Sequence, residues 1–116
     1  MPRRNKPLPI VFYATSAGRE PVRDWLKDLD KEDQREIGGD ILAVQQGWPL
    51  GLPLCRAIGH GLWEVRSTLQ GHRIARIIFA FDGDTIMLLN GFVKKAQKTP
   101  TAEIELALKR LKEITS

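Results

Sequence analysis

Hydrophobic and polar residues alternate with two different periods along the chain, and the first half shows mainly the helical period. Residues 9–15, PIVFYAT, are largely β-branched or aromatic and lead into the turn-forming SAG, which predicts a first strand. Residues 20–29 and 31–47 place apolar side chains at helical spacing, which predicts two amphipathic helices. Gly38 and Gly39 lie inside the second helix, and each weakens it by about 1 kcal/mol relative to alanine.

After a loop rich in proline and glycine, the period changes to two, as expected for strands with one buried face. Residues 62–68 and 73–81 show this alternation, and the Asp-Gly-Asp turn that follows them is typical of a tight hairpin. Residues 85–92 are apolar on both faces, which predicts a central strand. Thr99 and Pro100 are residue types that begin helices, so we predict a last helix after them.

The predicted order is strand, helix, helix, three antiparallel strands and helix, which defines an α+β fold in one domain over residues 1–116. The chain has 42% hydrophobic and 28% charged residues, a composition unlike that of disordered or collagen-like proteins. Its apolar stretches are far shorter than the roughly 20 residues that span a bilayer. Cys55 is the only cysteine, and no group of cysteines and histidines has metal-binding spacing. We therefore expect a cytoplasmic protein with no metal, no cofactor and no membrane partner.

The charge of the chain is distributed unevenly, and its distribution matters more than its net value of +4. Residues 18–40 contain five basic and eight acidic residues, whereas the first 17 residues and residues 91–116 each carry a net charge of +3. Basic ends around an acidic middle favour one face that attracts polyanions. Scattered, solvated charge without a binding role is the alternative that composition leaves open.

Two arginines and two lysines are predicted to converge on one side of the sheet. Arg66 and Arg76 occupy corresponding positions of neighbouring strands, and Lys94 and Lys95 follow the end of the next strand. Because arginine binds phosphate bidentately and lysine adds a compact charge, the four predict a phosphate site, unless they only keep the sheet surface soluble. We expect Arg76 in a surface site, where Arg76→Ala would abolish activity and leave the fold intact. Arg73 has the opposite parity, which suits a structural or peripheral position.

The acid and base that such a site needs are less clear from the sequence. Cleavage of RNA without a metal requires a base for the 2′-hydroxyl, cations around the phosphate and an acid for the leaving 5′-oxygen. Lysines crowded by other cations can act as the base or the acid. His60 and His72 lie in predicted turns and are alternatives for either role. Trp48 and Trp63 are candidates for stacking on bases, although the alternation around Trp63 favours the core.

The second half of the chain resembles a known protein family. Its stretches GLWEVR and RIARIIFAFDGDTIMLLNGFVKKAQKTPTAEIELALKR, within residues 61–110, are similar to the RelE/ParE superfamily of bacterial toxins, specifically its HigB-like, phage-related branch. The resemblance implies a small RelE-like fold, with a curved antiparallel sheet, an N-terminal helical hairpin and a C-terminal helix. It also implies the toxin of a type II toxin–antitoxin system, a metal-independent endoribonuclease that cleaves mRNA in the ribosomal A site. The implied partners are mRNA, the ribosome and a cognate helix-turn-helix antitoxin.

The family motifs fall on the residues that charge and strand parity select. By position, the resemblance implies catalytic roles for Arg66, Arg76, Lys94 and Lys95. Further residues are predicted to contact RNA, namely Arg73, Phe92, Lys98, His60 and His72. The tyrosine usual before the middle-strand arginine is Ala75 here, and the histidine often found before the Gly-Phe step is Asn90. Any role that this tyrosine and histidine have in relatives is therefore absent here or performed by another residue.

Two other functions are compatible with the same resemblance. A ParE-like toxin poisons DNA gyrase by binding it and needs no nuclease chemistry, so converging cations favour RNA cleavage over this alternative. A phage-derived remnant or a regulator that mainly binds an antitoxin and DNA is the third hypothesis.

Overall fold

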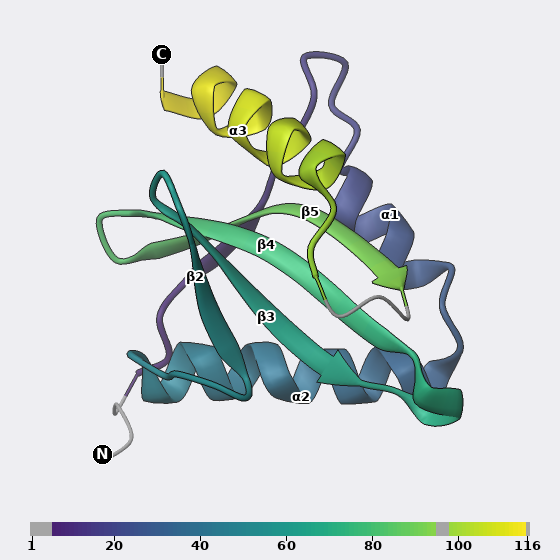
Figure 1. Ribbon diagram of the computed structural model, residues 1–116. Coiled ribbons are helices and arrows are strands. Elements are labelled where there is room, and N and C mark those ends of the chain that lie inside the picture. The colour runs from purple at the N-terminus through teal and green to yellow at the C-terminus, as the bar shows by residue number, and fades with distance from the viewer. Residues whose placement is uncertain (1–5, 95–97, 116) are drawn as a thin grey trace.

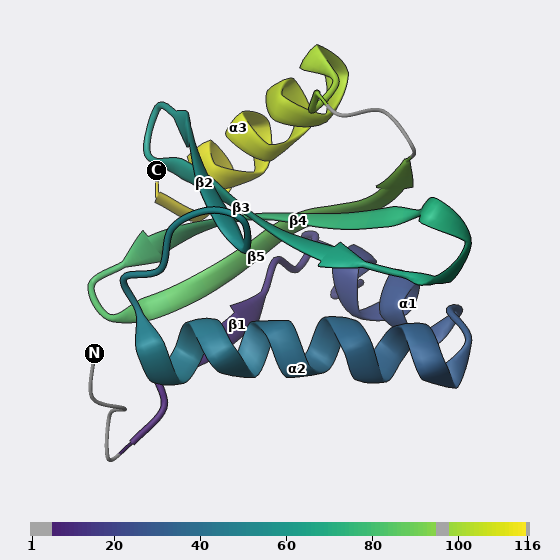
Figure 2. The same cartoon turned by 60° about the horizontal axis from the view of Figure 1, so that its bottom comes forward.

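A curved, five-stranded sheet lies between two helical layers (Figures 1 and 2). The computed structural model describes residues 6–94 and 98–115. In chain order, the elements are β1 (Ile10–Phe12), α1 (Pro21–Lys27), α2 (Lys31–Gly47), β2 (Cys55–Gly59), β3 (Leu62–Thr68), the 3-10 turn η1 (Gln70–His72), β4 (Ile74–Asp82), β5 (Thr85–Lys94) and α3 (Thr101–Thr115). The predicted small α+β fold, with a mostly antiparallel sheet and a C-terminal helix, is confirmed.

The strands lie in the order β1-β5-β4-β3-β2. The predicted antiparallel meander corresponds to β3, β4 and β5, and β5 lies inside the sheet because β1 pairs with it in parallel. The edge strand β2 is an addition to the predicted order, and it pairs antiparallel with β3. Its five residues, CRAIG, follow directly on a loop rich in proline and glycine, so they show too little alternation to predict a strand.

The two faces of the sheet bury different side chains, because neighbouring residues of a strand point to opposite sides. The helices α1 and α2 cover one face, and α3 covers the other (Figure 2). On the first face the core includes Val22, Ile37, Ile41, Val44, Val65, Ala75, Ile77, Phe79, Ile86 and Leu88. On the α3 face it includes Tyr13, Leu62, Ile78, Ala80, Met87, Leu89, Phe92 and Ala107. None of the described helices is both long and apolar enough to cross a membrane.

The three tryptophans all pack on the α1 and α2 face of the sheet. Trp48 and Trp63 meet edge to face with their ring centroids 4.9 Å apart, so both belong to this core rather than to a base-stacking surface. Trp25 of α1 lies directly over Gly91 of β5, where a Cβ atom would be only 2.6 Å from Trp25 Cζ3. This close approach explains why a glycine occupies a buried strand.

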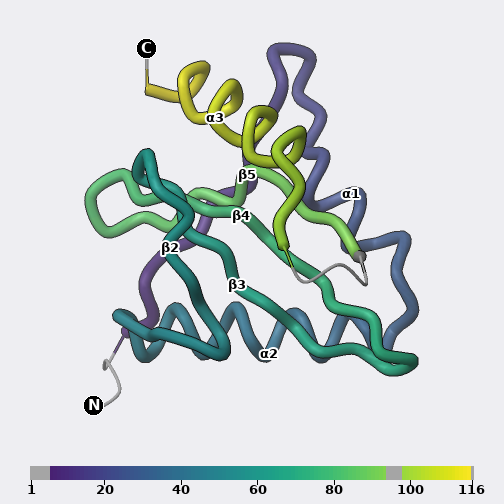
Figure 3. The backbone as a smooth tube through the Cα atoms, viewed as in Figure 1, coloured from purple at the N-terminus to yellow at the C-terminus, as the bar shows by residue number. Residues whose placement is uncertain are grey.

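Polar contacts fix α3 on the opposite face. Figure 3 follows the chain from β5 into α3, which runs back across the sheet toward the turn between β2 and β3. Asn90 Nδ2 donates a hydrogen bond to Glu103 Oε2 at 2.9 Å, and Arg110 Nη1 donates to a main-chain carbonyl of β5 at 2.8 Å. Near the end of the helix, the Tyr13 hydroxyl donates to Glu113. These contacts set where the first turn of α3 lies relative to the sheet.

Candidate active site

Arg66 and Arg76 are direct neighbours on the α3 face of the sheet. They are register partners across β3 and β4, and Phe92 of β5 lies opposite Arg76 on its other side. Strand parity predicted that the two arginines lie on one side of the sheet, and the register places them next to each other. Side chains of directly opposed residues start only about 5 Å apart, so two like charges at these positions require nearby anions.

Arg76 differs from the sequence-based expectation in its exposure. Its side chain is 0% exposed, so the expectation of a surface residue is wrong. Burial lowers the pKa of Arg76, the neighbouring Arg66 and Arg56 lower it further, and the carboxylate of Glu64 opposes them. Strand parity gave the face of Arg76 correctly, but the cover provided by its neighbours depends on tertiary packing.

Glu64 is the anion at the centre of these cations. It lies on β3 with the same parity as Arg66, and it is fully buried. Its Oε1 is 3.3 Å from Nε of Arg56, its register partner on β2, and its Oε2 accepts a hydrogen bond from the Thr99 hydroxyl. Arg56 Nη2 also lies 3.5 Å from Thr99 Oγ1, so the three groups contact one another. We call Arg56, Glu64, Arg66, Arg76 and Thr99 the arginine cluster.

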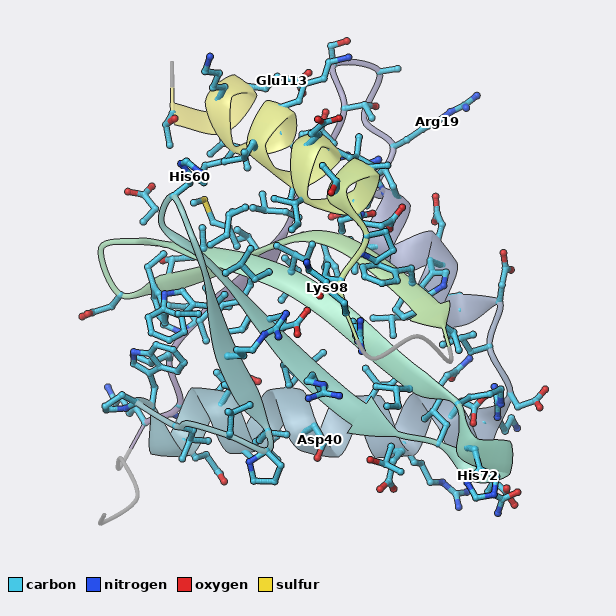
Figure 4. All side chains as sticks on the ribbon, viewed as in Figure 1. Arg19, Asp40, His60, His72, Lys98 and Glu113 are labelled. Carbon is cyan, nitrogen blue, oxygen red and sulfur yellow. The ribbon has the colours of Figure 1, made fainter. Side chains whose placement is uncertain are left out.

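The arginine cluster carries an excess of positive charge. It combines three guanidinium groups with one carboxylate, so its formal charge is +2. Among the described residues, no acceptor satisfies the buried Nε of Arg66, whose side chain is half-buried. Arg66 also borders a surface pocket of about 210 Å³ that includes Glu36 and Asp40 of α2, so acidic side chains lie near it as well. Figure 4 labels Asp40. An oxyanion bound at the cluster would balance its excess charge.

The sequence pattern did not indicate three residues of the site, Arg56, Glu64 and Thr99. Arg56 lies on the strand that was not predicted, so its face could not be assigned. Glu64 received no role from the sequence, because its partner Thr99 is 35 residues away. Thr99 was expected only to begin the last helix, whereas its side chain joins that helix to the sheet. The alternation of residues 62–68 already placed Glu64 on the face of Arg66, and this was the available signal.

Of the predicted lysines, the structure describes the side chain of Lys98 only. Lys94 is the last residue of β5, and its backbone pairs in register with Ile74 of β4. Lys95 lies outside the described residues. Lys98 is exposed and directly precedes Thr99, so it lies beside the start of α3 (Figure 4).

The other predicted RNA contacts do not gather at the cluster, apart from Phe92. His60 and His72 are both exposed and occupy opposite ends of β3, so they cannot serve one site together (Figure 4). Arg73 makes two hydrogen bonds of 3.0 and 3.1 Å to the buried carboxylate of Asp33 on α2. Hydrogen bonding to Asp33 raises the pKa of Arg73, which therefore ties the β3–β4 connection to α2.

The two departures from the family pattern have different structural meanings. Ala75 is 1% exposed and belongs to the core beneath α1 and α2, so it lies on the face opposite the arginine cluster. Asn90 lies on the α3 face, where it holds Glu103 rather than facing an open surface. Within the described ranges, no three side chains of histidine, cysteine, aspartate or glutamate are grouped to hold a metal ion.

Comparison with known proteins gives one family match. The family described as phage derived protein Gp49-like (DUF891) matches residues 24–112. The match begins within α1 and ends within α3, so it contains all five residues of the arginine cluster. No curated protein matches the chain significantly.

Proposed function

The chain belongs to the phage-derived Gp49-like family, a toxin-like family related to RelE- and HigB-type toxins, and from this premise we propose that it is the toxin of a type II toxin–antitoxin module. Its proposed activity is cleavage of mRNA in the ribosome, which stops translation in the cytoplasm. The family implies an antitoxin as partner, and we propose a helix-turn-helix protein for this role. The HigB-like branch is proposed on the motif GFVKKAQKTP.

The observation that carries the proposed nuclease activity is the buried Nε of Arg66, which is unsatisfied by the described residues and lies at the cationic arginine cluster. A phosphodiester gains negative charge on its oxygens during cleavage, and preorganised guanidinium groups stabilise that charge. Arg66 is half-buried and has a buried N–H for which the described residues offer no acceptor. A purely structural arginine would have such a group satisfied, because an unpaired buried donor costs about 1–3 kcal/mol.

The proposed reaction uses the 2′-hydroxyl of the RNA as nucleophile. Its oxygen attacks phosphorus and the bond to the 5′-oxygen breaks, which leaves a 2′,3′-cyclic phosphate and a free 5′-hydroxyl. Arg66 contacts the phosphate and stabilises the charge on phosphorus, and the buried Arg76 adds its positive charge from behind without contact. In this proposal, one of Lys94 and Lys95 takes the 2′-proton as a neutral amine, and the other donates a proton to the leaving oxygen. Nearby cations favour the neutral form of an amine, which suits a base beside the arginine cluster.

Purified components can test this function directly. The protein is added to ribosomes that carry a defined mRNA, and the 5′ ends of the products are mapped by primer extension. We expect cuts only in mRNA positioned on the ribosome, and little cleavage of the same RNA alone. Arg66→Ala should abolish the cuts, whereas Arg35→Ala, which removes the same charge from the exposed surface of α2, should not. Intact mRNA together with inhibited gyrase supercoiling would favour the ParE-like alternative instead.

A further inference from the structure

The guanidinium group of Arg56 contacts two neighbouring side chains and is also partly exposed to solvent. Its Nε contacts Glu64 at 3.3 Å and its Nη2 contacts Thr99 at 3.5 Å, while its side chain remains 37% exposed. A guanidinium group has five N–H donors arranged in a fork, and these two contacts use only part of them. The ion pair with Glu64 and the hydrogen bond to Thr99 favour one orientation of Arg56, and part of its donor set faces solvent on the α3 face.

Glu64 cannot contact a ligand itself, because it is 0% exposed. It is nevertheless joined to elements from three parts of the chain: β3, which carries it, Arg56 of β2, and Thr99 at the entrance to α3. This ion pair, buried on the Glu64 side only, gives little net stability, because the desolvation of Glu64 offsets much of the attraction. Its more specific consequence is geometric, since it sets where the partly exposed guanidinium of Arg56 points.

Resting on the proposed function, we propose that Arg56 binds a phosphate of the RNA next to the one that is cleaved, and that Glu64 and Thr99 position it. Arg56 lies on β2, two strands away from Arg76 on β4, so their backbones are roughly 9–10 Å apart at about 4.8 Å per strand. Arg66, with the buried charge of Arg76 behind it, acts on the scissile phosphate, whereas Arg56 contributes binding that is the same in the ground state and the transition state.

This assignment predicts a separation of kinetic effects. Loss of binding that is uniform along the reaction raises KM and leaves kcat unchanged. Arg56→Ala should therefore raise KM for ribosome-bound mRNA by about 10-fold, as expected for one charged hydrogen-bonding group, with little change in kcat. Arg66→Ala should lower kcat. Arg35→Ala is the matched control for charge and should change neither value.

Binding to a short RNA tests the same residue without cleavage or ribosomes. The probe is a fluorescent 2′-O-methyl oligonucleotide, which cannot be cut because it has no free 2′-hydroxyl. Arg56→Ala should weaken binding about 10-fold at low salt. It should also reduce the slope of log affinity against log salt concentration by about 0.7, the value for one phosphate contact on a single strand.

A double-mutant cycle separates positioning from simple stability. If Glu64 acts through Arg56, Glu64→Gln weakens RNA binding in the wild-type background and adds little in Arg56→Ala. Thr99→Val is the milder second variant, since it keeps the carboxylate and removes only the hydroxyl; it should weaken binding less, and likewise only when Arg56 is present. Thermal unfolding of each variant shows that binding is measured on folded protein.

The outcomes are distinguishable from a failure of the proposed function. If wild-type protein leaves ribosome-bound mRNA intact, the nuclease proposal fails, and the oligonucleotide cycle still decides the role of Arg56. If folded Arg56→Ala binds the oligonucleotide with wild-type affinity and salt dependence, the Arg56 proposal is overturned. Additive effects of Glu64→Gln and Arg56→Ala would show that Glu64 does not position Arg56.

Discussion

The contact between Trp25 and Gly91 gives a stability prediction that the structure quantifies. In Gly91→Ala, the new Cβ would lie 2.6 Å from Trp25 Cζ3 and 2.7 Å from Cε3. Carbon atoms pack at about 3.5–4.0 Å, so the indole or the strand has to shift by roughly 1 Å. The indole has little freedom to move, because it is packed between α1 and the core of that face.

Overpacking of a core by one methyl group typically costs about 1–3 kcal/mol. For a chain of this length, 1 kcal/mol changes the thermal midpoint by about 4 °C, so Gly91→Ala should lower it by roughly 4–12 °C. Gly39→Ala is the matched control, since Gly39 is an exposed glycine within α2 with no atom within 4 Å of a new Cβ. Alanine is favoured over glycine in helices by up to about 1 kcal/mol, so this variant should gain up to about 4 °C.

Thermal and urea unfolding, followed by circular dichroism and tryptophan fluorescence, measure both variants. The same change from glycine to alanine should thus lower the stability at position 91 and raise it at position 39. In the double variant with Trp25→Leu, the Gly91→Ala penalty should shrink, because the atoms that clash are absent. A Gly91→Ala protein as stable as wild type would refute the packing described for this face.

Three further predictions concern buried ionisable groups. Burial raises the pKa of Cys55 to about 11, so its neutral thiol stabilises the fold below pH 9, and this stabilisation is lost as the pH rises toward 11. The difference in unfolding free energy between wild type and Cys55→Ala should therefore change between pH 9 and 11. A constant difference over that range would contradict the prediction. Asp33→Asn should lower the urea midpoint because Arg73 loses its charged partner, whereas Asp28→Asn, an exposed control, should not. Arg76→Ala should cost about 3 kcal/mol of stability, unlike the surface residue first expected, because it removes a large, fully buried side chain and leaves a cavity.

Strand alternation and turn signals predicted most of the fold. The meander was recognisable because the strands of residues 62–68 and 73–81 alternate and the Asp-Gly turn separates the second from the next strand. The two helices of the hairpin were also predicted, although α1 ends at Lys27, two residues before the predicted end. Strand β2 was missed because five residues after a proline-rich loop carry too little pattern.

For the site, the sequence predicted only which face of the sheet each strand residue lies on. Parity places Arg66 and Arg76 on one face, and the register makes them partners. Parity cannot show that Arg76 is buried, since its cover comes from side chains on other elements. The Thr99–Glu64 and Arg73–Asp33 contacts join residues 35 and 40 positions apart, so no local pattern indicates them.

Cleavage of mRNA on the ribosome by the arginine cluster can be measured in cells. The wild-type protein, Arg66→Ala and Arg35→Ala are each induced in a bacterial host, and the 5′ ends of all transcripts are mapped. We expect growth arrest and new ends at defined positions within translated codons for the wild type and Arg35→Ala, and neither for folded Arg66→Ala. Growth arrest by the wild type with intact transcripts, or unchanged cleavage by Arg66→Ala, would contradict this expectation.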